Sequence, residues 1–383
     1  MSDRTADVVI IGAGIVGASC AWHLAKRGLS VVVLERERAP AMGSTGKSAA
    51  GVRVQFTTEA NIRLSMYSLP FYRTFAERFG HDIGYKDIGY LLLVPHDKWD
   101  RHLESVALQH RLGAPVEVLD PVSAQDFIPF DTEGIAGATY GAWDGVIDPH
   151  MVTHAWVAMG KELGVRYRFG THVTSIDREG GGWRVGTGVG SEMTSAPIVV
   201  NAAGAWSGGV AARAGLDVPV GPKRIQIFLS APISDPRTYP LTIDLATGVY
   251  LRSEGERVLF GLDNLQQEFG FTEGVDETWL EHVLLTGVGR FPWWDDLGID
   301  LKGSWWGYYG VSPDHSPIIG ANPATEGWID ACGFSGHGIM HAPVTGLAVS
   351  EMVADGGAHT VDVSGFRHAR FDSGDVAVET NIF

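Results

Sequence analysis

The chain has 383 residues, of which 45% are hydrophobic and 19% are charged, a composition typical of globular proteins with a sizeable core and not of disordered chains. Its 29 Lys and Arg residues against 45 Asp and Glu residues leave a net charge of −16, which argues against a general binder of nucleic acids or anionic membranes. The 50 glycines have no collagen-like period, so they predict many tight turns and close backbone approaches to a ligand.

The cysteines and the amino-terminal residues bear on the compartment. Cys20 and Cys332 are too few for a disulfide framework, and their spacing is not that of a zinc site. An apolar stretch near the amino end looks like a signal peptide, but it follows Asp3 and Asp7 beside a single Arg4, so the positive leader is missing. The expected compartment is therefore the cytoplasm. The 14 histidines are scattered, and no metal site is expected.

The first predicted unit consists of a strand, a turn, a helix and a second strand. The apolar run Val8–Ile11 is typical of a strand buried on both faces of a parallel sheet. A helix is expected from about Ile15 to Lys26, and the second strand, over 30–34, ends at Glu35. The turn between the first strand and the helix reads Gly12-Ala13-Gly14-Ile15-Val16-Gly17. These elements together predict a βαβ unit that binds a dinucleotide.

Each residue of this fingerprint has a physical role. Gly12 permits the tight turn, Gly14 lets the backbone approach a pyrophosphate, and Gly17 brings the helix close to the sheet. The pyrophosphate would lie on the N–H groups at the start of the helix, where the dipole is positive. Glu35 would accept hydrogen bonds from ribose hydroxyls. Because FAD and NAD share this fingerprint, it leaves the choice of dinucleotide open.

The remaining elements follow in chain order. A loop rich in Gly, Ser and Ala spans 43–51, and strand-like runs lie at 90–94 and 257–260. Further predictions are a helix over 150–163, strand material over 165–176, a strand at 198–200, a strand at 328–332 and a helix over 339–353. We therefore expect an α/β fold in which a Rossmann-like domain with a parallel sheet is interleaved with an α+β domain built on an antiparallel sheet.

Four segments carry a resemblance that extends from about residue 7 to residue 370. They are Gly43–Arg53, Asn201–Ser207, Ser312–Gly320 and Gly333–Gly338. In these segments the sequence resembles the D-amino-acid oxidase superfamily of FAD-dependent oxidoreductases, with glycine oxidase and sarcosine oxidase among its members. The Ser-Thr-Gly-Lys-Ser loop is most similar to the beta subunits of sarcosine oxidase and of dye-linked L-proline dehydrogenase.

The resemblance implies two interleaved domains and FAD as the cofactor. Residues 1–80, 146–220 and 311–371 would form the FAD-binding domain, residues 81–145 and 221–310 the substrate-binding domain, and residues 372–383 a weakly attached tail. FAD would be held without a covalent bond, because Gly307 stands where monomeric sarcosine oxidase has its linking cysteine. The positions expected to contact FAD are Gly12, Gly14, Ile15, Val16, Gly17, Glu35, Arg36, Ser44, Thr45, Lys47, Ser48, Val173, Ala203, Gly204, Trp206, Gly336, His337, Gly338, Ile339 and Met340.

The helix that begins after Gly336-His337-Gly338 has a chemical rationale of its own. Hydride arrival at flavin N5 leaves negative charge near N1 and the C2 carbonyl, and a helix N-terminus aimed there stabilises that charge. His337 would donate a hydrogen bond in this turn, and a structural role is an equal alternative.

The substrate end departs from the family pattern at several positions. Arg53 matches the arginine that binds the substrate carboxylate in sarcosine-oxidase-like members, and its planar fork suits a carboxylate. Met340 stands in place of a second anchor, a lysine, and Tyr309 in place of the arginine of glycine-oxidase-like members. Tyr309, Tyr308 and Tyr250 would then supply hydroxyl donors, and a packing role is the alternative for each. The expected catalytic residues are Arg53, Tyr250, Tyr309, His337 and Met340.

The resulting hypothesis is a FAD-dependent oxidoreductase that transfers hydride from an amino acid or N-substituted amino acid to flavin N5 and leaves an imine. The oxygen-activating lysine of monomeric sarcosine oxidase aligns near Leu259 and Phe260, which favours a dehydrogenase, although Lys47 could replace it. Oxygen, a quinone or a protein all remain open as electron acceptor. Alternatives are a 2-hydroxy-acid or glycerol-3-phosphate dehydrogenase, an NAD enzyme, and a FAD-carrying subunit of a larger homo- or hetero-oligomeric electron-transfer complex.

Overall fold

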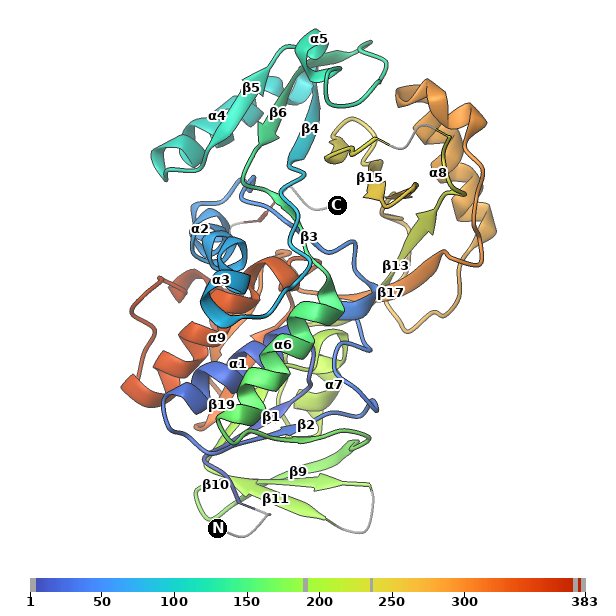
Figure 1. Ribbon diagram of the computed structural model, residues 1–383. Coiled ribbons are helices and arrows are strands. Elements are labelled where there is room, and N and C mark those ends of the chain that lie inside the picture. Colours follow the sequence, from blue (N-terminus) through green and yellow to red (C-terminus); the bar gives the residue numbers. More distant parts are fainter. Residues whose placement is uncertain (1–4, 189–191, 235–236, 375–377, 380–383) are drawn as a thin grey trace.

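The computed structural model describes residues 5–188, 192–234, 237–374 and 378–379. Its lower half in Figure 1 is built on a six-stranded sheet in which all neighbours are parallel except the pair β18–β19. In spatial order this sheet consists of β18 (Ile318–Ala321), β19 (Trp328–Cys332), β12 (Ile198–Asn201), β1 (Val8–Ile11), β2 (Val31–Leu34) and β8 (Arg166–Arg168). The predicted parallel sheet and the opening βαβ unit are confirmed.

Both faces of this sheet are covered, which explains why its strands are continuously apolar. Successive side chains of a strand point to opposite faces, so Val8 and Ile10 pack into one core and Val9 and Ile11 into another. Most helical residues of the first core come from α1 (Ile15–Lys26), α2 (Glu59–Arg73), α6 (Pro149–Glu162) and α9 (Gly338–Asp355). The second core contains residues of α7 (Ser207–Ala212) and of an antiparallel sheet formed by β9 (Val173–Glu179), β10 (Gly182–Thr187) and β11 (Met193–Ala196).

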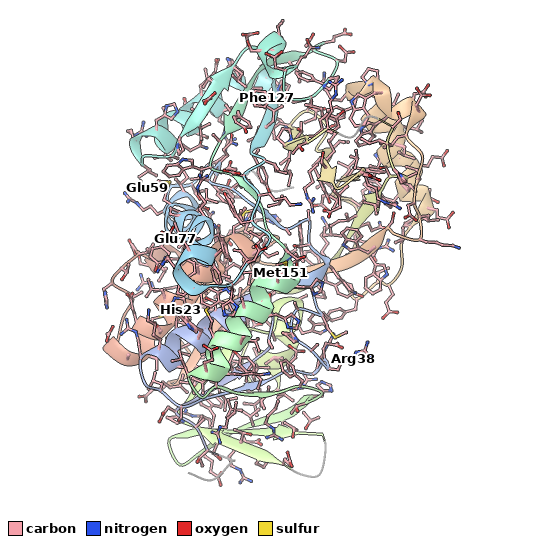
Figure 2. The ribbon with its side chains drawn as sticks, in the orientation of Figure 1. His23, Arg38, Glu59, Glu77, Phe127 and Met151 are labelled. Carbon is pink, nitrogen blue, oxygen red and sulfur yellow. The ribbon has the colours of Figure 1, made fainter. Side chains whose placement is uncertain are left out.

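Helices α1 and α9 cross at very short range. A Cβ on Gly346 would lie 2.3 Å from Ser19 Oγ and 2.6 Å from His23 Nδ1. His23 is buried between these helices and packs edge-on against Trp22 (Figure 2). The first residues of both helices, Ile15 and Gly338, line one and the same cavity, described below.

The upper half of Figure 1 contains an eight-stranded, largely antiparallel sheet. In spatial order its strands are β17 (Trp305–Val311), β13 (Gly221–Leu229), β16 (Arg257–Gly261), β15 (Tyr250–Glu254), β14 (Leu241–Asp244), β4 (Tyr90–Pro95), β6 (Ile135–Gly141) and β5 (Val116–Leu119). Only the neighbours β14 and β4 in this ordering run parallel. The expected α/β class with a separate antiparallel sheet is confirmed.

The remaining α-helices and strands of the described chain lie outside these sheets. They are α3 (Phe75–Phe79), α4 (Trp99–Arg111), α5 (Pro121–Ala124), α8 (Glu277–Arg290), α10 (Arg370–Ser373), and the strand pair β3 (Gly51–Val52) and β7 (Gly145–Val146). Within the four described ranges, no helix has the length and apolar character needed to cross a lipid bilayer.

Two expectations need correction. The strand material predicted over 165–176 is two strands in different sheets, β8 and β9, because the chain turns between them at Gly170, where φ is +65°. The segment expected to be a weakly attached tail includes Glu379, whose side chain is buried and accepts hydrogen bonds from Thr57 and Thr58. At Glu379 the tail is therefore held against the body of the protein.

Candidate functional site

The turn after β1 requires glycine at two positions. Gly12 has φ +108°, and a Cβ there would lie 2.4 Å from the carbonyl oxygen of Ala202. A Cβ on Gly17 would lie 2.1 Å from the carbonyl oxygen of Gly12, so this glycine lets α1 approach the turn. At Gly14 a Cβ would come within 3.1 Å of Thr45 Oγ1. The backbone is thereby left open to a ligand at the start of α1.

Glu35 ties this turn to the end of β2. Its Oε2 accepts a hydrogen bond from Ala13 N at 2.6 Å, and its Oε1 accepts one from Glu37 N at 2.8 Å. Each carboxylate oxygen can accept more than one hydrogen bond, so these contacts leave acceptor capacity for hydroxyl donors. The carboxylate therefore fixes the turn and still faces the cavity that the turn borders.

The loop expected to wrap the cofactor lies beside the same turn. Thr45 Oγ1 accepts a hydrogen bond from Ile15 N at 3.2 Å, and Ser48 Oγ accepts one from Ala50 N at 2.9 Å. Ser44 Oγ is buried and has no hydrogen-bond partner among the described residues. A buried hydroxyl without a partner is costly, so this atom is a candidate contact for a ligand.

Lys47 is directed elsewhere. Its ammonium lies 4.2 Å from the centre of the Trp306 ring, and its carbonyl oxygen accepts a hydrogen bond from Trp305 Nε1 at 2.9 Å. A Cβ on Gly307 would lie 2.9 Å from Lys47 Cβ. Lys47 thus connects the loop to β17 and does not line either cavity described below.

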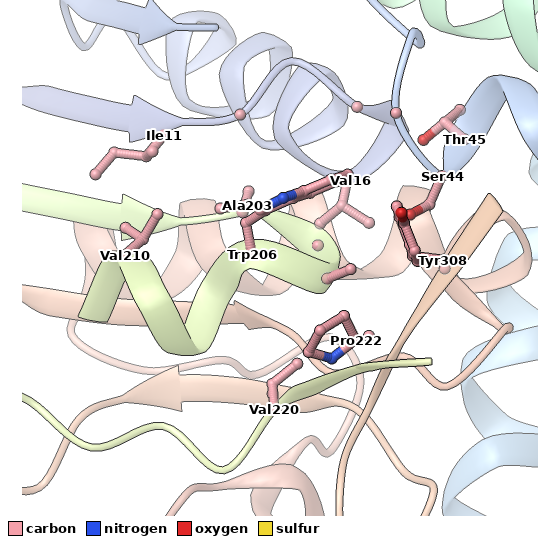
Figure 3. Close-up of a pocket in the computed structure, with 18 of the residues that line it drawn as sticks. Ile11, Val16, Ser44, Thr45, Ala203, Trp206, Val210, Val220, Pro222 and Tyr308 are labelled. Atoms are coloured by element: carbon pink, nitrogen blue, oxygen red, sulfur yellow. The ribbon is translucent and has the colours of Figure 1, made fainter. Parts of the chain in front are cut away.

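These segments surround a cavity of about 410 Å³ at the carboxyl ends of β1 and β12. Figure 3 shows side chains from distant parts of the chain pointing into it, among them Ile11, Ser44, Trp206 and Tyr308. It is lined by most of the positions predicted to contact FAD: Gly12, Gly14, Ile15, Val16, Glu35, Arg36, Ser44, Thr45, Ser48, Val173, Ala203, Gly204, Trp206, Gly336, Gly338 and Ile339. The remaining four predicted positions are Gly17, Lys47, His337 and Met340.

One wall of this larger cavity is aromatic. Trp206 stacks on Phe271 with the ring centres 5.2 Å apart, and the guanidinium of Arg36 lies 3.9 Å from the centre of the Trp206 ring. Tyr308 meets Trp206 edge-on at 5.8 Å. These contacts give the cavity a flat, cation-backed wall suited to a planar ring system.

Two helix N-termini border the larger cavity. The first residues of α1 and α9 line it, and neither helix has a side-chain cap hydrogen bond or an acidic residue in its first turn. The first N–H groups of a helix have no partner within the helix and carry a partial positive charge. The cavity therefore offers two separate positions that favour negative charge.

A second, smaller cavity of about 60 Å³ adjoins the larger one. Its lining residues are Ser48, Ala49, Ala50, Gly51, Arg53, Tyr90, Leu241, Ile243, Tyr250, Tyr309, Gly336, His337, Ile339 and Met340. The two cavities share Ser48, Tyr309, Gly336 and Ile339, so they meet at the start of α9. All five residues predicted to be catalytic line the smaller cavity.

Arg53 supplies the charge of the smaller cavity. The residue is 2% exposed, its NH1 donates a hydrogen bond to the carbonyl of Gln55, and its guanidinium lies 4.2 Å from the centre of the Phe56 ring. Burial lowers the pKa of Arg53 from its ordinary value, and nearby acidic groups oppose that shift. Because guanidinium remains protonated in proteins, the cavity contains a buried cation.

Three tyrosines face Arg53 across the smaller cavity. Burial raises the pKa values of Tyr90, Tyr250 and Tyr309, so each phenol stays neutral and able to donate a hydrogen bond at physiological pH. Tyr90 was missed by the sequence analysis, which counted it only as part of an apolar strand. No signal in the sequence indicated it; in the structure Gly51 makes room for this tyrosine, because a Cβ there would lie 1.6 Å from the Tyr90 hydroxyl oxygen.

His337 is a neutral group at the junction of the cavities. Burial holds its pKa well below 6.5, and its ring meets Phe56 edge-on at 4.8 Å. Its Nδ1 is buried and lacks a hydrogen-bond partner within the described part of the chain. An unprotonated imidazole in this place can give or take one hydrogen bond but carries no charge.

Among the described residues no cluster of side chains suited to a metal ion is present.

Comparison with known proteins places this geometry in context. A family model described as FAD-dependent oxidoreductase matches residues 7–352. FAD-dependent oxidoreductase domain-containing protein 1 of Xenopus laevis is 31% identical over 98% of this chain and 85% of that protein. Dimethylglycine dehydrogenase of Rattus norvegicus is 29% identical over 92% of this chain, which covers 43% of that enzyme.

The solved structures add a close match in three dimensions. L-proline dehydrogenase from P. horikoshii superposes with a TM-score of 0.90 at 29% identity, covering 98% of this chain and 100% of that one. Glycine oxidase from Geobacillus kaustophilus superposes with a TM-score of 0.84 at 24% identity, covering 95% and 98% of the two chains, a likeness of fold.

Proposed function

The chain belongs to the DAO family of FAD-dependent oxidoreductases, and from this membership we propose that it oxidises the carbon–nitrogen bond of an amino acid or N-substituted amino acid. The product would be an imine, which water hydrolyses. We further propose that the enzyme is a dehydrogenase, with an electron acceptor other than oxygen. The similarity to L-proline dehydrogenase and to dimethylglycine dehydrogenase supports such substrates.

FAD is the family's cofactor, and the larger cavity fits it. The uncapped start of α1 would hold the pyrophosphate, Glu35 the ribose, and the start of α9 the electron-rich edge of the ring system. Ser44 Oγ, which lines the larger cavity and is buried without a hydrogen-bond partner in the described part of the chain, is positioned to gain a hydrogen bond from it. When bound, FAD accepts the electron pair and the hydrogen that leave the substrate carbon.

The observation that carries the proposal is the buried guanidinium of Arg53 in a small cavity that opens onto the larger one. A planar carboxylate can accept two parallel hydrogen bonds from a guanidinium, so Arg53 suits a substrate carboxylate. Tyr250 and Tyr309 lie on the same cavity and can donate to a second polar group. A small molecule that carries a carboxylate beside its reactive carbon satisfies these groups.

The smaller cavity would act by positioning the substrate and by excluding water. Leu241, Ile243, Ile339 and Met340 give it apolar walls, so an amine that enters it loses its hydration. Arg53 repels a protonated amine, which favours the neutral form needed for oxidation. Holding the substrate carbon against the junction of the cavities accounts for most of the rate enhancement that such a site can supply.

The position of Lys47 supports a dehydrogenase. Reduction of oxygen needs a cation near the reacting ring edge, because superoxide is negatively charged. The Lys47 ammonium lies over Trp306, and among the described residues that line the smaller cavity the one lysine or arginine is Arg53, which we assign to the substrate. Without a second cation there, electrons would pass to a dye, quinone or protein.

Anaerobic mixing tests the proposal. The purified holoprotein is mixed with L-proline, sarcosine, dimethylglycine and common L- and D-amino acids, and the flavin absorbance is followed. Bleaching by an amino acid, with faster turnover by an artificial dye than by oxygen, is the expected result. Bleaching only by 2-hydroxy acids or glycerol 3-phosphate would contradict it, as would a colourless protein that binds NAD. A flavin that no small molecule reduces would indicate an electron-relay subunit.

A further inference from the structure

A carboxylate near the end of the chain is bound at the start of helix α2. The side chain of Glu379 is 0% exposed, and its two oxygens accept hydrogen bonds from Thr57, Thr58 and Asn61. The donors are Thr57 N at 3.1 Å, Thr57 Oγ1 at 2.7 Å, Thr58 N at 3.2 Å, Thr58 Oγ1 at 2.9 Å and Asn61 Nδ2 at 3.2 Å. All five of these donors are neutral groups, supplied by one short stretch more than 300 residues away in sequence.

Glu379 accepts hydrogen bonds at the start of a helix that has no side-chain cap from its own N-cap residue. Thr58 precedes α2 in the N-cap position, but its side chain accepts no cap hydrogen bond from the helix backbone; its hydroxyl donates to Glu379 and accepts a hydrogen bond from Asn61 Nδ2 at 2.9 Å. The positive end of the 15-residue helix faces the carboxylate, which stabilises a buried negative charge there. Glu59, the first residue of α2, lies at the outer edge of the molecule in Figure 2. The contact is thus a specific, long-range cap.

The same stretch of chain begins at Arg53, which lines the smaller cavity. Asp144 fixes one part of it by accepting a hydrogen bond from Val54 N at 2.8 Å, and Glu379 fixes the other part at Thr57 and Thr58. Between these two attachments Phe56 contacts the guanidinium of Arg53. Residues 53–58 are therefore held at both ends, with the cavity arginine at one of them.

We propose that Glu379 is a positioning residue for substrate binding: by fixing Thr57 and Thr58 it holds residues 53–58 so that the Arg53 guanidinium faces the smaller cavity. This inference rests on the proposed function, because it takes Arg53 as the carboxylate anchor. Loss of the Glu379 carboxylate leaves the five donors without their acceptor and frees the stretch to shift. A shift of about 1 Å at an anchor can cost up to about a hundredfold in activity.

Binding of a carboxylate that cannot be oxidised provides the test. Cyclopentanecarboxylate, which has the ring and carboxylate of proline but no amine, is titrated into the holoprotein and followed by the flavin difference spectrum. We expect Glu379→Ala and Glu379→Gln to raise its Kd about tenfold, with the FAD Kd changed by less than about twofold. In turnover, KM for the amino acid rises by the same factor while kcat stays near the wild-type value. Val378→Ala, at an exposed neighbouring position, is the matched control.

A second readout needs no ligand. Hydrogen exchange of the amides of residues 54–58 is expected to accelerate in Glu379→Ala, and in Thr57→Val to a smaller extent, while β1 and β12 keep wild-type protection. Any one of three results would overturn the proposal. They are a wild-type Kd for cyclopentanecarboxylate in both Glu379 variants, unchanged hydrogen exchange in residues 54–58, and an equal loss of FAD affinity. If the wild-type protein oxidises no amino acid, the proposed function fails, and the exchange measurement still decides whether Glu379 orders the Arg53 stretch.

Discussion

Tyr309 and Gly336 meet where the two cavities join. A Cβ on Gly336 would lie 2.8 Å from Cζ of the Tyr309 ring, and Gly336 has φ +99°, a conformation that side chains disfavour. The tyrosine comes from β17 and the glycine from the turn before α9, so this contact joins the eight-stranded sheet to the start of α9. Both residues line both cavities.

Gly336→Ala should therefore widen or distort the junction. We expect the FAD Kd to rise at least about tenfold, because the strained backbone and the contact with the tyrosine ring cost about 1–3 kcal/mol. Quenching of flavin fluorescence on titration measures the Kd. Gly289→Ala, in α8 with no atom near the added Cβ, should bind FAD as the wild type does. Normal FAD binding and turnover in Gly336→Ala would contradict this account of the junction.

Arg53→Ala should raise KM for carboxylate substrates about a hundredfold or more, because a buried charge pair that loses one partner costs about 2–5 kcal/mol. Arg53→Lys should recover only part of the loss, since a point charge cannot form two parallel hydrogen bonds with a carboxylate. Steady-state kinetics with the substrate found by anaerobic mixing measure both effects. Arg63→Ala, which removes an exposed ion pair with Glu59, is the control. An unchanged KM in Arg53→Ala would remove Arg53 from this role.

Acid should destabilise the fold through two buried histidines. Burial lowers the pKa of His23 and that of His102 to about 4, from 6.5. Both histidines are neutral in the folded protein at pH 7. Their contribution to the free energy of unfolding is fully present above pH 6.5, and it is lost as the pH falls from there through about 4. Each shift corresponds to roughly 3 kcal/mol.

Denaturant unfolding at pH 7 and at pH 4.5 measures this loss. His102→Gln keeps a group that can bond to Thr139 Oγ1, the present partner of His102 Nε2, and cannot be protonated, so it should lose less stability in acid. His96→Gln, at an exposed position, should leave the pH dependence as in the wild type. Equal acid sensitivity of wild type and His102→Gln would exclude His102 as a cause.

Lys47→Met should leave both dye reduction and oxygen consumption within about twofold of wild type, because exposed or peripheral contacts rarely contribute more than about 0.5 kcal/mol. The ammonium lies over Trp306 and not in a cavity, whereas the methylene groups that methionine keeps pack beside Gly307. Parallel assays with an oxygen electrode and with a dye check this. A selective fall in oxygen consumption would show that Lys47 reaches the reacting centre.

How well the sequence predicted each feature depends on how far apart in the chain the interacting residues lie. The βαβ unit was predictable because Gly12, Gly17 and Glu35 act within one local turn. The place of Arg53 in the smaller cavity was predictable only through the family resemblance. Other walls of this cavity come from β4, β14, β15 and β17, which are separate segments of the chain. Tyr90 read as an ordinary strand residue.

The contacts that sequence could not predict are long-range contacts between side chains. Nothing near Glu379 in the sequence indicates that its carboxylate binds at the start of α2, because the donors lie more than 300 residues earlier. Lys47 stands in a loop that resembles a cofactor loop, yet a partner on β17, Trp306, directs its side chain. Patterns in sequence fix backbone elements well, whereas the direction of one long side chain depends on what packs against it.

The order of strands in the parallel sheet has a consequence for how the protein is made. β1 and β2 come early in the sequence and pair with each other, but the outer neighbour of β2, β8, ends at Arg168, and the outer neighbour of β1, β12, ends at Asn201. Until those two strands are synthesised, the edges of the βαβ unit remain unpaired and able to join a neighbouring nascent chain. We expect the newborn protein to depend on chaperones until residue 201 has been synthesised, and any fragment that stops before that residue to aggregate.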